Sequence, residues 1–486
     1  MLKLSKDVYL DKLKACWIGK NIGGTLGAPF EGQRELLDIS GFSTPLGEPL
    51  PNDDLDLQLV WLVAMERCGP EYVNANVLSD YWLEWIAPHW NEYGIAKANL
   101  RLGLLPPLSG EIDNDKWKHS NGAWIRSEIW AGLAPGVTDV AVKYAVADAT
   151  VDHGLGEGSY AEVFTAVLQS AAYIESDIRV LIDTALSKIP EDCLVARTVR
   201  LVIECYDSGV SYREARERVV EFNRELGWFQ APGNLGFVII GLLYGEGDYK
   251  RSVLYAVNCG DDTDCTAATV ASTLGIIGGC AAIPDDWKEF VGERIVTVSI
   301  NGMFAYQIPK TCDELAQRVY ELVPRVMRAN KVKFTFTDGE SDYPEKYKKR
   351  YNSTSPEVYF ARSRYSYDVT HYGAFSVRVE YDETPRVGPL ESRHVKLTFI
   401  CARDAMEPRR LDLRALLPDG WMLSGDGFTK NILLEYPQPE HKIYGTAVVE
   451  FDLTVGCNMN SSCRAYIEVT SPSLAYPAMI PIVFVG

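Results

Sequence analysis

The sequence has no cysteine pattern that would hold a zinc ion. Its eleven cysteines are scattered over 486 residues, without a Cys-x-x-Cys pair or a Cys/His cluster at zinc spacing. Cys457 and Cys463 lie close together, but a separation of six residues is not a zinc signature. Free thiols in a reducing compartment account for this pattern, so we expect a cytoplasmic protein.

Long apolar runs are missing too. No run reaches the roughly 18 apolar residues that a membrane span needs, and residues 1–7 lack the apolar core of a signal peptide. We therefore expect no membrane partner. The formal charge of -18 also argues against a nucleic-acid partner, because such proteins neutralise phosphates with Lys and Arg. The oligomeric state stays open.

Motifs of two common enzyme classes are absent. The glycine-rich stretch from Gly19 to Gly27 follows a helical segment and no Gly-Lys-Ser/Thr comes after it, which excludes a phosphate-binding loop. No Gly-x-Ser-x-Gly elbow occurs near a plausible catalytic triad. Neither a dinucleotide-binding fold nor a serine hydrolase is expected.

The texture of the sequence changes near residue 330. Before it, apolar residues recur at three and four, as in Leu10, Leu13, Trp17 and in Val163, Val167, Ala171. After it, apolar and polar residues alternate, which predicts strands over 332–336, 377–381, 394–399, 447–451 and 465–469. We predict an all-α domain over residues 1–330 and an antiparallel β-sandwich over residues 331–486, with 338–368 as a linker or a strap over the helices.

The first acidic cluster is Asn52-Asp53-Asp54, at the start of a helix predicted over about 55–67. One such residue can cap the helix by accepting its unpaired N–H groups. Three oxygen-bearing side chains exceed what a cap needs, and adjacent carboxylates repel unless a positive charge lies between them. A hard cation such as Mg²⁺ would supply that charge.

The second acidic cluster, Asp261-Asp262-Thr263-Asp264, opens a helix rich in small residues. Small residues at spacings of three and four let helices approach closely, so this helix is expected to be buried. Buried carboxylates without partners are very costly. Capping together with an ion pair is one explanation, and a shared site for one or two hard cations is the other.

Five blocks of residues, taken in order, resemble the ADP-ribosylglycohydrolase family over about residues 8–300. The blocks are Gly19-x3-Gly23-Gly24-Thr25-Leu26-Gly27-Ala28-Pro29-x-Glu31, Asn52-Asp53-Asp54, Asn121-Gly122-Ala123-x-x-Arg126, His153, and Gly260-x-Asp262-Thr263-Asp264. The resemblance implies an orthogonal all-α bundle with a two-Mg²⁺ centre in a cleft. It also implies hydrolysis of ADP-ribose linked to a protein side chain or a related acceptor.

The resemblance implies a role for each matching residue. The metal ligands would be Asn52, Asp53, Asp54, Asp262 and Asp264, with Asn52 standing where the family usually has Thr. The catalytic residues would be Glu31, as a general base or acid, and Asp54. The substrate-binding residues would be Asn121, Gly122 and His153.

The sequence departs from the family pattern at three positions. Gly24 replaces the usual Asp, Asp261 replaces a usual Gly, and Cys265 replaces a usual Thr ligand. A thiol is a poor partner for Mg²⁺, which prefers hard oxygen. A second cation would therefore need Asp261 or a water in place of Cys265, and the number of ions stays at one or two.

The sequence thus predicts a Mg²⁺-dependent glycosyl hydrolase that acts on a small-molecule, ADP-ribosylated or other glycosidic substrate. One alternative keeps the chemistry and changes the substrate to a carbohydrate or nucleoside-like linkage. A second alternative is an inactive protein that binds ADP-ribose or a glycan.

Overall fold

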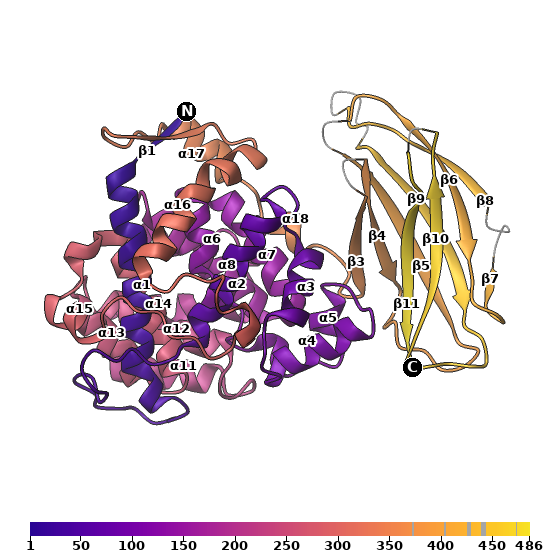
Figure 1. The fold of residues 1–486 in the computed structure, drawn as a ribbon. Helices are drawn as coiled ribbons and strands as arrows, with labels where there is room; N and C mark the ends of the chain where they lie inside the picture. Colours follow the sequence, from indigo (N-terminus) through magenta and orange to yellow (C-terminus); the bar gives the residue numbers. More distant parts are fainter. Residues whose placement is uncertain (372–373, 403–404, 425–428, 439–443, 473) are drawn as a thin grey trace. The chain divides into compact units, whose positions relative to one another are not determined.

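The chain forms two compact units, and each is described by itself (Figure 1). The computed structural model describes residues 1–371, 374–402, 405–424, 429–438, 444–472 and 474–486. One unit comprises residues 1–94 with 114–361, and the other comprises residues 95–113 with 362–486. The domain boundary at residue 330 stays a prediction.

The first unit is helical, as predicted. Its long helices are α1 (Lys6–Gly27), α2 (Asp53–Cys68), α3 (Ala75–Glu84), α7 (Thr138–His153), α8 (Glu157–Ala172), α9 (Ile178–Leu186), α10 (Leu194–Asp207), α11 (Tyr212–Phe222), α12 (Ala231–Tyr244), α13 (Tyr249–Asn258), α14 (Thr263–Gly278) and α16 (Cys312–Ala329). Shorter helices are α6 (Glu128–Leu133), α15 (Asp285–Val291), α17 (Glu345–Tyr351) and α18 (Glu357–Phe360). Helix α4 (Asn91–Arg101) begins in this unit, and α5 (Leu108–Glu111) lies in the other.

Helices α1 and α14 pack against each other without side chains between them. A Cβ atom added to Gly19 would lie 2.5 Å from the carbonyl oxygen of Ala271, and one on Gly23 would lie 2.3 Å from the backbone of Ala268. Both distances are too short for any real Cβ contact, so only glycine permits this approach. The glycine-rich stretch is therefore a helix-packing surface, which agrees with the absence of a phosphate loop.

A parallel strand pair joins the two ends of the helical unit. Strand β1 (Leu2–Ser5) pairs in register with β2 (Phe334–Thr337). A strand is thus present near the predicted 332–336, but it pairs with β1 and not with a strand of the sandwich. The segment that follows lies on helices, because Asp139 on α7 accepts hydrogen bonds from the backbone N–H groups of Ser353 and Thr354. This part of 338–368 is a strap, one of the two predicted possibilities.

The second unit is built from two antiparallel sheets. One has the order β11-β10-β6-β8 and the other has the order β3-β4-β5-β9-β7. The strands are β3 (Ser366–His371), β4 (Phe375–Tyr381), β5 (Ser392–Cys401), β6 (Arg409–Leu416), β7 (Met422–Ser424), β8 (Thr429–Leu434), β9 (Thr446–Thr454), β10 (Ser462–Thr470) and β11 (Ala478–Val485). The strands predicted over 377–381, 394–399, 447–451 and 465–469 are confirmed.

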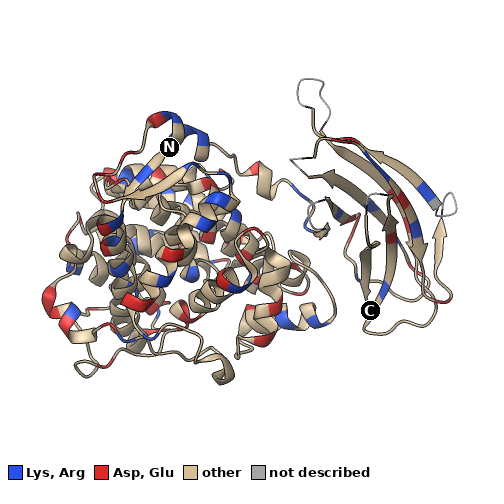
Figure 2. Ribbon diagram, turned by 45° about the horizontal axis from the view of Figure 1, so that its top comes forward, with Lys and Arg blue, Asp and Glu red and all other residues tan. Residues whose placement is uncertain are grey.

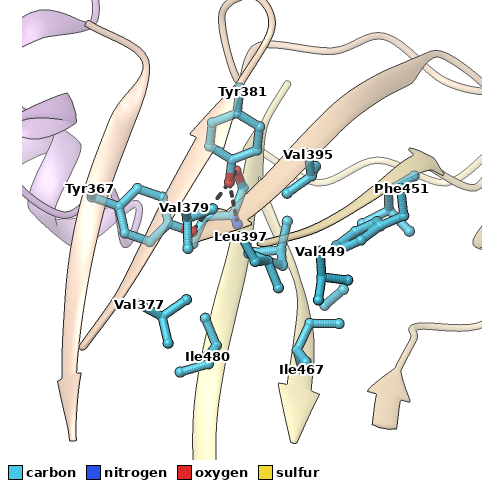
Figure 3. Close-up of a cluster of buried hydrophobic side chains, with 14 of the residues drawn as sticks. Tyr367, Val377, Val379, Tyr381, Val395, Leu397, Val449, Phe451, Ile467 and Ile480 are labelled. Carbon is cyan, nitrogen blue, oxygen red and sulfur yellow. Dashed lines mark hydrogen bonds between the residues drawn. The ribbon is translucent and has the colours of Figure 1, made fainter. Parts of the chain in front are cut away.

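Side chains from both sheets share one apolar core (Figure 3). Val377 and Val379 of β4 alternate with less buried neighbours, and Ile467 and Ile480 enter from the other sheet. The hydroxyl of Tyr381 is satisfied inside this core, since it donates to the carbonyl oxygen of Val483 at 2.8 Å. Alternation with period two therefore produces the predicted sandwich.

Charged residues of both signs are spread over the helical unit (Figure 2). Among the described residues, no helix is both long enough and apolar enough to cross a membrane.

Candidate active site

The start of α2 places two aspartates beside the end of α1. Asn52 is the N-cap of α2, and its amide oxygen accepts the N–H of Asp54 at 2.9 Å. A Cβ atom on Gly24 would lie 1.9 Å from the amide nitrogen of Asn52. The Asn52 amide therefore occupies the space beside Gly24. Asn52 and Gly24 both depart from the residues expected from the resemblance, and here the missing side chain of Gly24 leaves room for the amide of Asn52.

The start of α14 places Asp262 and Asp264 at the same end of α1. Asp262 is the N-cap residue of α14 and Asp264 lies in its first turn. A side-chain oxygen of Asp262 accepts a hydrogen bond from the amide of Asn121 at 2.7 Å. The hydroxyl of Thr263 donates to the carbonyl oxygen of Gly27 at 2.8 Å, which ties α14 to α1.

Asp261 lies in the left-handed region, with φ of 67°, where the family usually has Gly. Its carboxylate accepts hydrogen bonds from the amide of Asn234 at 2.8 Å and from the N–H of Phe229. Asp261 belongs to neither of the possible metal-ligand groups found among the described residues. Its carboxylate therefore holds the neighbouring loop.

Two groups of side chains could each hold a cation, and they share Asp264. One consists of Glu31, Asp262 and Asp264, and the other of Asp54, Asp264 and Cys265, with ligand atoms within 4.8 Å of one another in each. Within the described chain, Oδ1 of Asp264 and Oδ2 of Asp54 are buried and accept no hydrogen bond. Such oxygens are costly unless a positive group meets them.

Asp54 already has two partners of its own. The ammonium group of Lys20 on α1 lies 3.3 Å from its Oδ2 atom, and the Cys265 thiol donates to its Oδ1 atom at 3.2 Å. Lys20 also pairs with Glu128 at 3.1 Å. At Asp54 the thiol therefore acts as a hydrogen-bond donor, whereas a metal ligand must present a lone pair.

The pKa values of the cluster are raised. Burial raises the pKa of Asp54 to about 7, although Lys20 acts in the opposite direction. Burial, together with the other carboxylates, raises the pKa of Asp53 and of Asp262 well above the ordinary range. Burial also raises the pKa of Asp264, and Glu31 adds to this effect. Lys20 alone therefore does not offset burial and mutual repulsion, and ionisation of the whole cluster is disfavoured without a further positive charge.

A pocket of about 380 Å³ opens onto this cluster. Asp53, Asp262, Asp264 and Cys265 line it on the acidic side, whereas Asp54 lies behind them and is fully buried. Glu31 follows the short helix η1 (Ala28–Phe30) and is the exposed member of its group. The remaining lining residues are Trp90, Asn91, Glu92, Tyr93, Trp117, Ser120, Asn121, Gly122, Ile125 and Phe229.

The predicted substrate-binding residues fall into two sets. Asn121 and Gly122 line the pocket. His153 is fully buried and is not among the lining residues; its Nε2 atom lies 3.1 Å from the hydroxyl of Ser120, which does line the pocket. His153 therefore contacts the pocket through Ser120.

A second polar cluster lies close behind this wall, around Arg126. Its guanidinium donates to Asp152 at 3.0 and 2.7 Å and to Oδ1 of Asp148 at 3.0 Å. The indole of Trp130 donates to the other oxygen of Asp148 at 2.9 Å. All four carboxylate oxygens thus have donors. Burial alone would raise the pKa of Asp152, but Arg126 and His153 hold it at about 2.

Sequence reasoning missed several residues of the site. Lys20 and Asn21 are the polar residues of the segment from Ala15 to Gly24, and a lysine in such a segment is a usable signal for a buried ion pair. Glu92 and Asn234 gave no local signal, because their partners are distant in sequence. Asp56 is structural, since it accepts the N–H groups of Val298 at 2.7 Å and of Ser299.

The fold and the pocket together define a helical protein with an acidic site that could take a cation. Residues 5–326 match the family model of the ADP-ribosylglycohydrolases. The chain therefore belongs to the ADP-ribosylglycohydrolase family, a family of glycohydrolases of the ADP-ribose type.

The comparison with solved structures finds an "ADP-ribosylglycohydrolase-related protein complex". It shares 21% identity and a TM-score of 0.42, and the alignment covers 65% of this chain and 99% of that chain. No curated protein matches the chain.

Proposed function

We propose that the protein is a metal-dependent hydrolase that cleaves an N- or O-glycosidic bond, most readily that of an ADP-ribosyl group or a related ribosyl substrate. The observation that carries this proposal is the convergence of Glu31, Asp262 and Asp264 on the wall of a pocket. Family membership supports the type of bond. The unpaired carboxylate oxygen of Asp264 supports a cation.

One Mg²⁺ ion fits the donor set better than two. Asp262, Asp264 and the predicted ligands Asn52 and Asp53 offer only oxygen, as Mg²⁺ prefers, which leaves the Glu31 carboxylate of the same group free for proton transfer. At the second position, the Cys265 thiol donates to Asp54 and Lys20 supplies a positive charge. A bound ion would hold the hydroxyl groups of the sugar and act as a Lewis acid near the anomeric carbon.

Glu31 is our candidate for the residue that takes a proton from the attacking water. It is the exposed member of its group, so its carboxylate can meet both solvent and the interior of the pocket. Burial, with Asp54 and Asp261, raises its pKa, which makes it a better base near neutral pH. In this proposal Asp54 contributes to catalysis through its charge behind the pocket wall, and it does not touch the substrate.

The loop at Asn121 and Gly122 would border the bound substrate. Asn121 is held by two hydrogen bonds, one to Asp262 and one from the Trp124 indole at 3.0 Å, so its position follows that of the acidic cluster. His153 would act on the substrate only through Ser120.

A carbohydrate or nucleoside-like substrate is the second candidate. Trp90, Tyr93, Trp117 and Phe229 line the same pocket, and aromatic rings stack on sugar and base faces alike. The third possibility, an inactive binding protein, is disfavoured because the carboxylates that hydrolysis needs are all present around one pocket.

Turnover of a panel of substrates would test the proposal. The panel contains ADP-ribosyl-arginine, ADP-ribosyl-serine and several aryl glycosides, each measured with Mg²⁺ and with EDTA. We expect cleavage that EDTA abolishes. Asp262→Asn should lose both Mg²⁺ binding and turnover while it keeps the fold, and Asp38→Asn, whose side chain is 99% exposed, should match the wild type.

Each failure has its own meaning. Activity that persists in EDTA would rule out the metal. Tight ADP-ribose binding without cleavage of any substrate would rule out the enzyme. Normal Mg²⁺ binding by Asp262→Asn would show that the ligand assignment is wrong.

A further inference from the structure

A second carboxyl group enters the pocket away from the predicted metal ligands. Glu92, the second residue of α4, lines the pocket although its side chain is only 6% exposed. Its Oε2 atom has no hydrogen-bond partner among the described residues. Buried carboxyl oxygens without partners are rare in folded proteins, and each needs an explanation.

The chain makes room for this carboxyl group at Gly122. A Cβ atom on Gly122 would lie 2.2 Å from Oε1 of Glu92, so a larger residue there would displace the carboxyl group. The preceding residue, Asn121, donates to Asp262 at 2.7 Å. Two consecutive residues of one loop thus contact a predicted metal ligand and Glu92. The two carboxyl groups therefore flank the same stretch of the pocket wall.

Ser120 lines the same pocket as Glu92 and is held from behind. Its hydroxyl donates to the carbonyl oxygen of Trp117 at 2.6 Å and lies 3.1 Å from Nε2 of His153. His153 in turn lies 3.0 Å from Asp152, which Arg126 holds. Oε1 of Glu92 lies against Gly122, and Oε2 is buried without a partner among the described residues, in a residue that lines the pocket.

We propose that Glu92 is the general acid that gives its proton to the leaving atom of the glycosidic bond, while Glu31 takes a proton from the attacking water. This inference rests on the proposed function. The oxygen of the water bonds to the anomeric carbon, and the bond to the leaving nitrogen or oxygen breaks with its electron pair on that atom. The proton of Glu92 completes the leaving group, Glu31 holds the proton from water, and exchange with solvent restores both.

The surroundings of Glu92 keep it protonated more readily than an exposed glutamate. Burial raises its pKa and outweighs the opposite effect of His153. A raised pKa lengthens the pH range over which a carboxyl group still has a proton to donate. Pairs of carboxyl groups with these two tasks are the usual machinery of glycoside hydrolysis.

The dependence of the rate on the leaving group would test this role. The two probes are an ADP-riboside of 4-nitrophenol, which leaves without help, and an ADP-riboside of serine, which needs a proton. For Glu92→Gln we expect a loss in kcat of about 10²- to 10⁴-fold on the serine compound, and a loss below about tenfold on the nitrophenyl compound. Thermal stabilisation by Mg²⁺ should equal that of the wild type, which shows that the fold and the acidic cluster are intact.

A matched control is Glu162→Gln. Glu162 is fully buried and both of its oxygens lack hydrogen-bond partners within the described chain, but it does not line the pocket. Glu162→Gln should leave the ratio of kcat on the serine compound to kcat on the nitrophenyl compound unchanged. Equal losses by Glu92→Gln on both probes, or no loss on either, would overturn the assignment of Glu92 alone. Failure of the wild type to cleave either probe would overturn the proposed function, and the role of Glu92 with it.

Discussion

Two groups of buried carboxyl groups lie in the helical unit, and they differ in how their oxygens are satisfied. Around Arg126, every oxygen of Asp148 and Asp152 accepts a hydrogen bond from the guanidinium or from Trp130. Around the pocket, Asp264 keeps an oxygen without a donor among the described residues, while the free oxygen of Asp54 lies 3.3 Å from the Lys20 ammonium. Asp148 and Asp152 are therefore satisfied within the protein, so this pair supports the fold. The second group leaves a buried oxygen of Asp264 unsatisfied beside the pocket, which supports the proposed cation site.

The largest change in stability is expected from a substitution of Arg126, and it tests whether the two groups differ. Arg126→Met should lower the free energy of unfolding by about 3–5 kcal/mol, because two aspartates would stay buried without their partner. Urea unfolding in EDTA measures this. Asp262→Asn, measured in the same way, should change stability by less than about 1 kcal/mol, since it removes a carboxyl group that its neighbours repel. Similar losses in both variants would mean that the two groups do not differ in kind.

One aspartate of each group, Asp54 and Asp152, should respond to pH in opposite directions. Asp54 has a folded pKa of about 7, above its unfolded value of about 4. The folded state therefore binds its proton more tightly, and this stabilisation is lost as the pH rises from about 4 to 7. Asp152 has a folded pKa of about 2. Its stabilisation is present above pH 4 and is lost as the pH falls toward 2.

Unfolding midpoints in EDTA between pH 2 and 8 would show both slopes. Asp54→Asn should flatten the decline between pH 4 and 7, and Asp152→Asn should flatten the loss on the acid side. If Asp54→Asn leaves the decline unchanged, other groups, such as Asp56 with its pKa of about 7, account for it.

The smallest expected effect is on the number of Mg²⁺ ions that the site binds. Cys265→Thr would replace a thiol that donates to Asp54 with a hydroxyl oxygen, which Mg²⁺ accepts as a ligand. We expect the binding stoichiometry to rise from one ion to two, measured by calorimetric titration. Cys265→Ala removes the thiol and adds no oxygen, so it should keep one ion. Two ions in the wild type would contradict our reading of the thiol.

The features that could be predicted from the sequence are those determined by residues close to one another along the chain. Cap-forming residues located the starts of α2 and α14, and alternation located strands such as β4 and β9. The sequence could not predict that the oxygen of Asn52 caps α2 while its nitrogen fills the space beside Gly24. That arrangement depends on two helices meeting in space.

Other features of the molecule also depend on distant contacts. The parallel pairing of Leu2–Ser5 with Phe334–Thr337 joins segments more than 300 residues apart, and neither segment carries a sign of its partner. The position of Glu92 in the pocket could not be predicted for the same reason, because its neighbours Gly122 and Ser120 lie about 30 residues further along the chain.

The close packing of α1 on α14 bears on how the substrate range of such a protein can change. A side chain at Gly19 or Gly23 would collide with the backbone of α14, so these glycines set how closely the end of α1 that leads to Glu31 approaches the start of α14 at Asp262. The aromatic side of the pocket, residues 90–93 and Phe229, lies outside this helix pair. Mutations there can widen or narrow the pocket during evolution or in the laboratory, while the geometry offered to the cation is inherited unchanged.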